Sequence, residues 1–272
     1  FEITANSTNQ TGSVHGNTAV DLNTNFSLLW KVKFGCDNFG GEGMAFVFQP
    51  GPWTLGTGNF GLGYQGLTNA LAVEFDTRDN QASGQTTNWD IAGDHISLMQ
   101  NGTIDHSSAD CLTGLPLDPI STLTGDVEDC EWHLVEIVWT AGATQTITVN
   151  VDGAQSLTYT GDMITNSLGG NNMVLYGWTG STGPVFTNQQ LVEVALCPDF
   201  TISPTNCPGQ VITFNANVQS QFPITQYDWD FDGTPLNNGG PNPTHTYATA
   251  GNHPTTLTVT DNQGCTADTV IE

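Results

Sequence analysis

Short stretches in which apolar and polar residues alternate recur along the chain, whereas the spacing typical of amphipathic helices is almost absent. Thr146–Val151 is the clearest example, because it alternates residue by residue, meets Asp152-Gly153 and then resumes. A period of two places successive side chains on opposite faces of a strand, and Asp-Gly tolerates the positive φ angles of a tight hairpin turn. Asn101-Gly102 follows a similar run, and 31 glycines supply many further turns. The pattern predicts an all-β fold, either a sandwich or a barrel.

A change in composition near residues 197–208 divides the chain. Prolines become dense and alternation is lost in Cys197–Pro204, which indicates a linker or a first edge strand. Beyond it, Val211–Val218 and Thr255–Thr260 have the spacing of a small sandwich. The 272 residues are enough for one large and one small domain, and we expect these at 1–197 and 198–272.

The charge is strongly unbalanced, with 27 acidic residues against 3 basic ones and a formal net charge of -24. Such a chain repels phosphate backbones and anionic lipid surfaces, which argues against nucleic-acid and membrane partners. No apolar stretch is long enough to span a bilayer. The excess of carboxylates suits a protein that collects divalent cations, although acidity also serves solubility alone.

Six cysteines form an even set without a closely spaced pair of the kind that thiolate zinc sites use, so disulfides are the better interpretation. Disulfides imply an oxidising compartment, and we expect a secreted or cell-surface protein whose signal peptide has been removed before Phe1. Six cysteines allow fifteen connectivities. They are Cys36, Cys111, Cys130, Cys197, Cys207 and Cys265.

The segment from Ala70 to Asn80 carries the most chemistry. In a strand, Glu74 and Asp76 share one face while Val73 and Phe75 share the other. Two carboxylates about 4 Å apart repel by roughly 4 kcal/mol at an effective dielectric constant of 20, so a cation is expected between them.

Further ligands follow along the chain. Oxygen atoms of Asp76, Asn80, Asp90 and one backbone carbonyl would suit calcium. Adding the imidazole of His95 to Glu74, Asp76 and Asp90 gives a neighbouring site better suited to a transition metal. The plainer alternative is an acidic surface strand beside an ordinary loop. The other histidines, including His106, lack partners at ligand spacing and are interpreted as structural or surface residues.

These residues resemble the legume-type lectins and their bacterial relatives, whose hallmark is a Val-Glu-Phe-Asp-Thr strand. An Asn follows the Glu by six residues, and a His follows a later Asp by five, as Glu74, Asn80, Asp90 and His95 do. The loop before Asp90 is longer than in plant members, and Ile91 replaces the usual proline. Similarity extends over most of residues 1–195, with further landmarks at Gly43–Phe48, Trp132–Trp139, Val149–Gly153 and Gly177–Gly183. The resemblance implies a concanavalin-like jelly-roll β-sandwich.

The resemblance also implies roles for the site. Asp76, Asn80, Asp90 and the Arg78 carbonyl would hold Ca²⁺, and Glu74, Asp76, Asp90 and His95 would hold Mn²⁺ or a similar ion. Calcium would fix the loop so that the Asn80 amide can donate to a sugar hydroxyl, which reduces the ordering entropy of ligand binding. The residues matching the family's sugar contacts are Glu42, Gly58, Asn80 and the loop Gly180, Ser181, Thr182 and Gly183.

Two of these positions depart from the family pattern. Glu42 is one methylene longer than the expected aspartate, and Arg78 stands where most members place an aromatic ring. The guanidinium either offsets nearby carboxylates such as Glu42 and Asp79, which we favour, or pairs with an acidic sugar. A sandwich-fold glycoside hydrolase would need Glu-x-Asp-x-Glu, and Arg78 replaces the last acid, so we expect no enzyme activity.

The second region resembles the polycystic-kidney-disease-type (PKD) repeat, an immunoglobulin-like sandwich, through Trp229-Asp230-Phe231-Asp232-Gly233. Trp229 and Phe231 are expected in its core, with Asp230 and Asp232 bracing turns rather than holding a metal. By this resemblance Cys207 pairs with Cys265, which would leave the pairs Cys111–Cys130 and Cys36–Cys197.

The expected function is calcium-dependent glycan binding that attaches a bacterium or a surface appendage to its target. A structural or assembly subunit that binds no sugar is the alternative from another class. The sequence leaves open the sugar, self-association and any further domains after Glu272.

Overall fold

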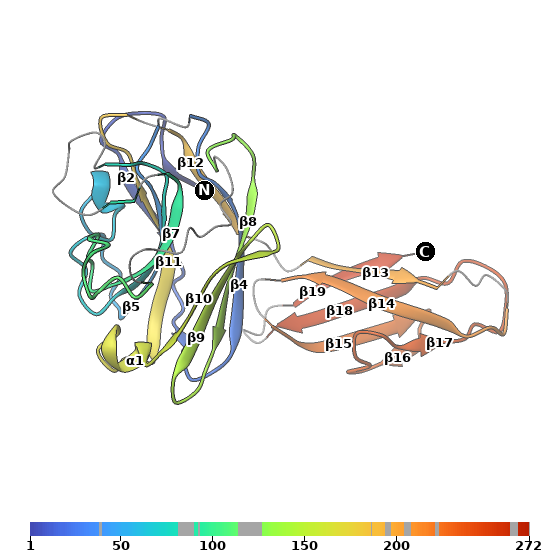
Figure 1. Ribbon diagram of the computed structural model, residues 1–272. Helices are drawn as coiled ribbons and strands as arrows, with labels where there is room; N and C mark the ends of the chain where they lie inside the picture. Colours follow the sequence, from blue (N-terminus) through green and yellow to red (C-terminus); the bar gives the residue numbers. More distant parts are fainter. Residues whose placement is uncertain are drawn as a thin grey trace. The chain divides into compact units, whose positions relative to one another are not determined.

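The computed structural model describes residues 1–37, 40–80, 90–91, 93–113, 127–185, 187–193, 197–203, 208–220, 223–261 and 266–271. The side chains of residues 193, 197–199 and 219 lie outside this description. The chain divides into two compact units, formed mainly by residues 1–192 and by residues 193–272 (Figure 1). Among the described residues, no helix has the length and apolar character needed to cross a bilayer.

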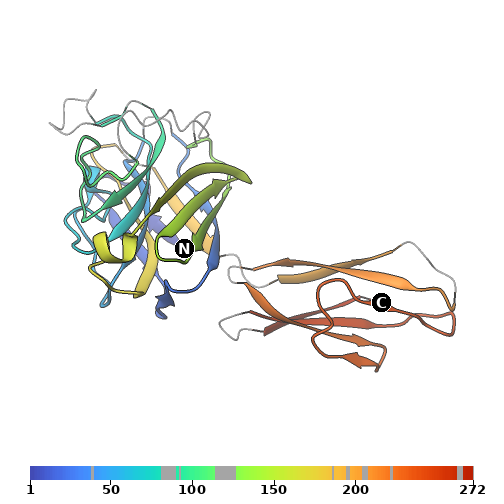
Figure 2. The same cartoon turned by 60° about the horizontal axis from the view of Figure 1, so that its bottom comes forward.

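Two sheets form the first unit, and Figures 1 and 2 show them facing each other. One has the strand order β1 (Glu2–Thr4), β12 (Gln189–Glu193), β4 (Phe26–Lys33), β8 (His133–Thr140), β9 (Gln145–Val151) and β10 (Ala154–Gly161). The other has the order β2 (Thr11–His15), β11 (Met173–Ser181), β5 (Gly43–Gln49), β6 (Leu71–Asp76) and β7 (His95–Gln100), with β3 (Val20–Asp21) beside β11. Apart from the short helices η1 (Asn59–Gly61) and α1 (Met163–Asn166), the described elements are strands, so the predicted all-β class is confirmed.

The hairpin predicted at Asp152-Gly153 forms. Asp152 and Gly153 join β9 to β10 with φ angles of 50° and 78°, and the strands then pair in antiparallel register. Asn101 and Gly102, with φ angles of 55° and 66°, form a turn that ends β7, but among the described residues only an isolated bridge between Met99 and Cys111 follows it instead of a hairpin strand. Positive φ at both positions is the requirement of the type I′ turn, which Asn-Gly and Asp-Gly satisfy at low cost.

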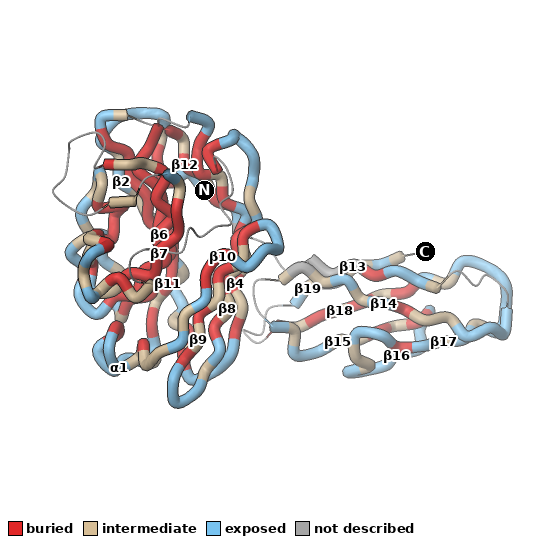
Figure 3. The backbone as a smooth tube through the Cα atoms, viewed as in Figure 1, coloured by how far each residue is buried: buried red, intermediate tan, exposed pale blue. Residues whose placement is uncertain are grey.

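Aromatic residues fill the space between the two sheets. Trp30 in β4 lies with its ring centroid 4.9 Å from that of Phe46 in β5 and 5.9 Å from that of Trp178 in β11. These contacts join strands of opposite sheets, and burying such large side chains supplies most of the stability of a sandwich. Figure 3 shows the buried strands gathered in this interior.

A second apolar cluster covers the outer face of β5, β6 and β7. It combines small sheet residues, such as Ala45 and Ala72, with side chains from the segment between β5 and β6, such as Leu62 and Tyr64. Met99 of β7 and Cys111 also belong to it. As a result every residue of β6 is buried on both faces, including its two acids. The alternative of an acidic surface strand is therefore wrong.

The second unit is a small sandwich of two sheets. Strands β13 (Cys197–Ile202), β14 (Ile212–Gln219) and β17 (Thr244–His245) form one, and β16 (Pro235–Leu236), β15 (Ile224–Phe231), β18 (Thr255–Asp261) and β19 (Thr266–Ile271) form the other. Residues Cys197–Ile202 thus make the edge strand that the sequence offered as one of two alternatives. Trp229 and Phe231 are buried in the core with Phe200 and Phe214, as predicted.

One disulfide links Cys36 to Cys130, with a Cα–Cα distance of 4.2 Å. The predicted pairs Cys36–Cys197 and Cys111–Cys130 are therefore wrong. Cys36 follows β4 and Cys130 precedes β8, the neighbouring strand, and the Cys130 amide donates to the Gly35 carbonyl at 3.0 Å. Strand adjacency, which sequence spacing does not reveal, thus chooses the partner. Cys207 and Cys265 lie outside the described residues, as does the side chain of Cys197.

Candidate functional site

The register of β6 and β7 brings the predicted ligands together. Asp76 lies opposite His95, and Glu74 lies opposite Ser97. Directly opposed residues of an antiparallel pair share a face, and so do residues two apart on one strand. All four side chains therefore lie on the face that carries the outer apolar cluster, at its polar end.

Glu74 is fully buried. Neither of its carboxylate oxygens accepts a hydrogen bond from the residues that the structure describes, although His106 Nε2 lies 3.3 Å from Oε2. Burial, followed by the nearby Glu74 charge, raises the pKa of Tyr64 well above its usual value. A carboxylate held like this lacks the compensation that burial normally requires.

Asp76 is 3% exposed and its Oδ1 accepts the backbone amide of Arg78 at 2.8 Å. Burial, then the charges of Asp90 and Glu74, raises the pKa of Asp76 well above its ordinary value. Asp90 Oδ2 accepts a hydrogen bond from the backbone amide of Asn80 at 2.6 Å, so residues 80 and 90 are held together. Burial also raises the pKa of Asp90. Three acids thus converge without a cationic partner among the described residues that matches their charge.

His95 contributes a buried imidazole, and burial lowers its pKa. Its Nδ1 lies 2.9 Å from the Gly93 carbonyl oxygen, and its Nε2 lies 3.1 Å from Nε2 of His106. His106 is 2% exposed and belongs to the same cluster, contrary to its interpretation as a structural or surface residue. The predicted turn at Asn101-Gly102 indicated that the chain returns toward β7. The sequence spacing did not indicate which residue would reach the acids.

These residues fit divalent cations. Calcium prefers hard oxygen ligands, and this region offers them as carboxylates, an amide side chain and backbone carbonyls. Imidazole nitrogens extend the set toward transition metals. Within the described part of the chain, ligand atoms of Asp90, His95 and His106 lie within 4.8 Å of one another. Glu74, Asp76, Asn80 and Arg78 adjoin them on β6 and the segment that follows it. The ligand atoms that lie mutually close thus belong to Asp90, His95 and His106, and the full predicted set with Glu74, Asp76, Arg78 and Asn80 stays a prediction.

Glu42 and Arg78, the two residues that depart from the family pattern, lie beside each other. Glu42 is fully buried, and Arg78 Nη1 lies 3.9 Å from its Oε1. Burial raises the pKa of Glu42, while the Asn80 side chain and the Arg78 charge lower it. The guanidinium is thus placed to offset this carboxylate. Glu42 also packs against Gly183, where an added Cβ would collide with Oε1.

The remaining sugar-contact predictions fall on residues whose polar groups bind the protein itself. The Ser181 hydroxyl donates to the Asn59 carbonyl, and the Thr182 hydroxyl donates to the Ser7 carbonyl at 2.7 Å. Both residues are fully buried, and Gly180 is buried in β11. Gly58 is partly buried and packs so closely on Thr11 that a Cβ would collide with its hydroxyl. These positions lie near Glu42, and none of their hydroxyls is exposed to solvent.

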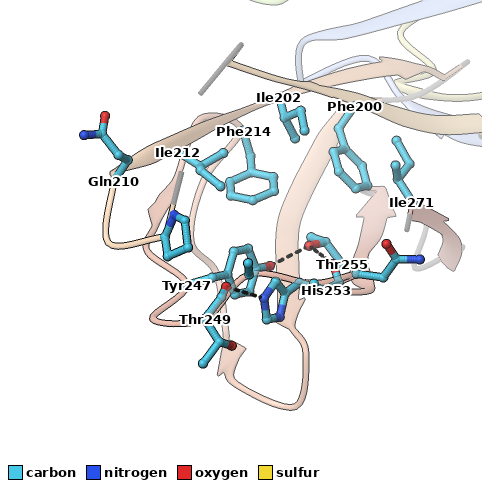
Figure 4. Close-up of a pocket in the computed structure, with 14 residues that line it drawn as sticks. Phe200, Ile202, Gln210, Ile212, Phe214, Tyr247, Thr249, His253, Thr255 and Ile271 are labelled. Atoms are coloured by element: carbon cyan, nitrogen blue, oxygen red, sulfur yellow. Dashed lines mark hydrogen bonds between the residues drawn. The ribbon is translucent and has the colours of Figure 1, made fainter. Parts of the chain in front are cut away.

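The second unit has a cavity of about 290 Å³ (Figure 4). Phe200, Phe214 and Ile271 contribute apolar walls, and Tyr247 and His253 stack with centroids 4.1 Å apart. No carboxylate is among the described residues that line it. It therefore offers none of the acidic ligands found in the first unit.

Comparison with known proteins agrees with this division. Residues 1–195 match the legume lectin β-barrel domain, and residues 197–271 match the PKD domain. Among solved structures, a lectin from Bauhinia forficata in complex with GalNAc is similar, with 18% identity, a TM-score of 0.51 and coverage of 70% of this chain and 82% of that one.

Lectin II from Ulex europaeus has 19% identity and a TM-score of 0.49, over 70% of this chain and 83% of that one. The Ca²⁺-bound exoplasmic/lumenal domain of VIP36 has 16% identity and a TM-score of 0.46, over 71% and 78%. The match over residues 1–195 covers most of the chain, so this protein belongs to the legume lectin family and carries a PKD domain after its lectin domain.

Proposed function

We propose that this protein is a calcium-dependent carbohydrate-binding protein that is secreted or displayed on a bacterial surface and adheres to glycans. One observation supports the calcium requirement most strongly. Glu74 and Asp76 are buried side by side with Asp90 nearby, and the described residues supply too little positive charge to stabilise all three as carboxylates. Family membership supports the carbohydrate ligand.

Calcium would be held by Asp76, Asp90, Asn80 and the Arg78 carbonyl. A second divalent ion would be held with the help of Glu74 and His95. Bound cations would supply the positive charge that these carboxylates lack. The chain's own contribution is positional: Asp90 holds the Asn80 backbone at 2.6 Å, which fixes the residue proposed to donate its amide to a sugar hydroxyl. Such preorganisation lowers the entropy lost when ligand binds.

We also propose that the protein acts by binding and not by catalysis. A hydrolase of this sandwich type needs a second catalytic carboxylate where this chain has Arg78. The guanidinium faces Glu42 across 3.9 Å, so the position supplies a cation instead of an acid.

A surface-appendage subunit without sugar binding is the second candidate. The burial of Glu42, Ser181 and Thr182 favours it, because their polar atoms are not available to an external ligand in this conformation. The two candidates differ in whether the metal-bound loop recognises a glycan.

Asn80→Asp tests the proposal directly. The substitution keeps an oxygen for calcium and removes the amide donor, so calcium affinity measured by calorimetry should persist while glycan-array binding should be lost. Chelation of the wild-type protein should abolish the same glycan signals. Asn23→Asp, at an exposed position, is the matched control and should bind glycans like wild type.

The outcomes separate the candidates. Calcium binding without any glycan signal, acidic sugars included, would favour the structural subunit. Absence of calcium uptake, together with a melting temperature that chelator does not change, would overturn the proposal.

A further inference from the structure

The imidazole of His106 is placed where a metal ligand would be. It lies between the Asn101-Gly102 turn and the bridge that pairs Met99 with Cys111, so the chain folds back over the acid-bearing face of β6 and β7. Its Nε2 is 3.1 Å from Nε2 of His95 and 3.3 Å from Oε2 of Glu74. The two rings are nearly perpendicular, at 72°, and both are buried.

The hydrogen bonding of His95 determines which of its nitrogens can bind a metal. Its Nδ1 lies 2.9 Å from the Gly93 carbonyl oxygen, which can only accept, so Nδ1 carries the hydrogen. The neutral ring then presents a lone pair at Nε2, directed at the His106 side of the cluster. A ligating histidine whose other nitrogen donates to a carbonyl is the usual arrangement in metal sites.

The spacing of the donor atoms fits a single ion. Zinc–nitrogen bonds of about 2.0–2.1 Å place two ligand atoms about 3.3 Å apart at a tetrahedral angle and about 2.9 Å apart at a right angle. The separation of 3.1 Å between Nε2 of His106 and Nε2 of His95 falls in this range. Asp90 supplies a further oxygen, since its ligand atom lies within 4.8 Å of both imidazoles.

We propose that His106 is a direct ligand in a two-imidazole, one-carboxylate site with His95 and Asp90, beside Glu74, and that this site selects Zn²⁺ or Co²⁺ over Mn²⁺ and Ca²⁺. The inference rests on the proposed function, because it concerns the second ion of the same centre. Manganese and calcium favour sites dominated by oxygen, whereas each imidazole shifts preference toward later first-row ions. His106 thus adds a second imidazole to the one that His95 supplies in the predicted site.

The test is competitive metal loading of the full chain. Wild type is dialysed against equal concentrations of Ca²⁺, Mn²⁺ and Zn²⁺, and bound metal is counted by mass spectrometry; Co²⁺ titration monitored by its visible absorption gives affinities. Wild type should retain zinc beside calcium. Replacing a residue that only hydrogen-bonds to a metal ligand lowers metal affinity by about 10-fold to 100-fold. Because His106 is proposed as a ligand itself, His106→Gln should weaken Co²⁺ and Zn²⁺ binding by more than that. Its calcium affinity should be unchanged.

His133→Gln is the matched control, since His133 contacts Asp129 and Asp152 away from this cluster, and it should behave as wild type. X-ray absorption spectroscopy of the zinc-loaded wild type provides a measurement that no substitution can disturb, and it should count two imidazoles. One imidazole, a preference for Mn²⁺, or equal zinc affinity in His106→Gln would overturn this inference while leaving calcium-dependent glycan binding intact. Loss of all metal binding in wild type would overturn both.

Discussion

Each of the two units contains a strand in which acids alternate with aromatic or apolar residues. The acids are buried in one unit and exposed or partly exposed in the other. In the lectin domain, Glu74 and Asp76 flank Phe75 and are buried, with neither Glu74 oxygen accepting a hydrogen bond from a described residue. In the PKD domain, Asp230 and Asp232 flank Phe231, where Asp232 remains exposed and Asp230 is only partly buried.

The PKD acids have partners within the chain. Asp230 Oδ1 accepts the Gly233 amide at 2.6 Å, and Asp232 Oδ2 lies 2.9 Å from His253 Nδ1. These contacts brace the turn after β15, as predicted. The two strands therefore differ in whether another layer covers the face that carries the acids, and we expect a cation only where that face is covered. In the lectin domain, the segment between β5 and β6 and the segment around His106 provide that cover.

The largest contrast is expected in calcium affinity. Asp76→Asn removes one ligand charge from the buried cluster and should lower calcium affinity by at least about 100-fold, whereas indirect partners of metal ligands cost about 10-fold to 100-fold. Asp230→Asn makes the same chemical change on the equivalent strand of the PKD domain and should leave the affinity unaltered. Calorimetric titration of both variants decides the matter, and equal losses would remove the contrast.

The pH dependence of stability should change sign with metal. In chelator, burial holds the pKa of Asp76 above its unfolded value of about 3.9, so between these two values the folded chain binds a proton that the unfolded chain has released. The free energy of unfolding should therefore fall as pH rises through that window. Glu42 and Asp90, whose pKa values burial also raises, act in the same direction.

With saturating calcium the slope should reverse, because protons compete with the ion and stability is then lost as pH falls. Denaturant unfolding at several pH values, with calcium and with chelator, measures both slopes. Parallel slopes would mean that the ion does not engage these carboxylates.

The smallest effect is expected from removing the turn-bracing contact. Asp230→Ala leaves the Gly233 amide without its side-chain acceptor and should destabilise the PKD domain by about 1 kcal/mol. The loss should be the same in calcium and in chelator, in contrast to substitutions at Asp76. Thermal unfolding in the two conditions tests this, and a calcium-dependent loss would place a cation at Asp230.

Local sequence predicted much of the fold, since the hairpin at Asp152-Gly153, the turn at Asn101-Gly102 and the buried Trp229 depend on turn chemistry and apolar content. Strand periodicity also predicted that Glu74 and Asp76 share a face, and the resemblance to legume-type lectins added His95, whose strand the structure pairs with theirs. Local sequence failed for Cys36, whose partner Cys130 is set by the adjacency of β4 and β8. It failed equally for His106, which reaches the acids through a fold-back without periodic pattern.

By itself the sequence determined an all-β chain in two parts and two acids on one strand face, because alternation is a local property. Its resemblance to legume-type lectins and PKD repeats supplied the sandwich architecture and the imidazole ligand. Only the tertiary structure decided that those acids are buried, that His106 joins them, and that Arg78 faces Glu42. Burial and encounters between distant segments arise when loops pack over a sheet face. That packing depends on the shape and volume of the whole core, which no single stretch of sequence encodes.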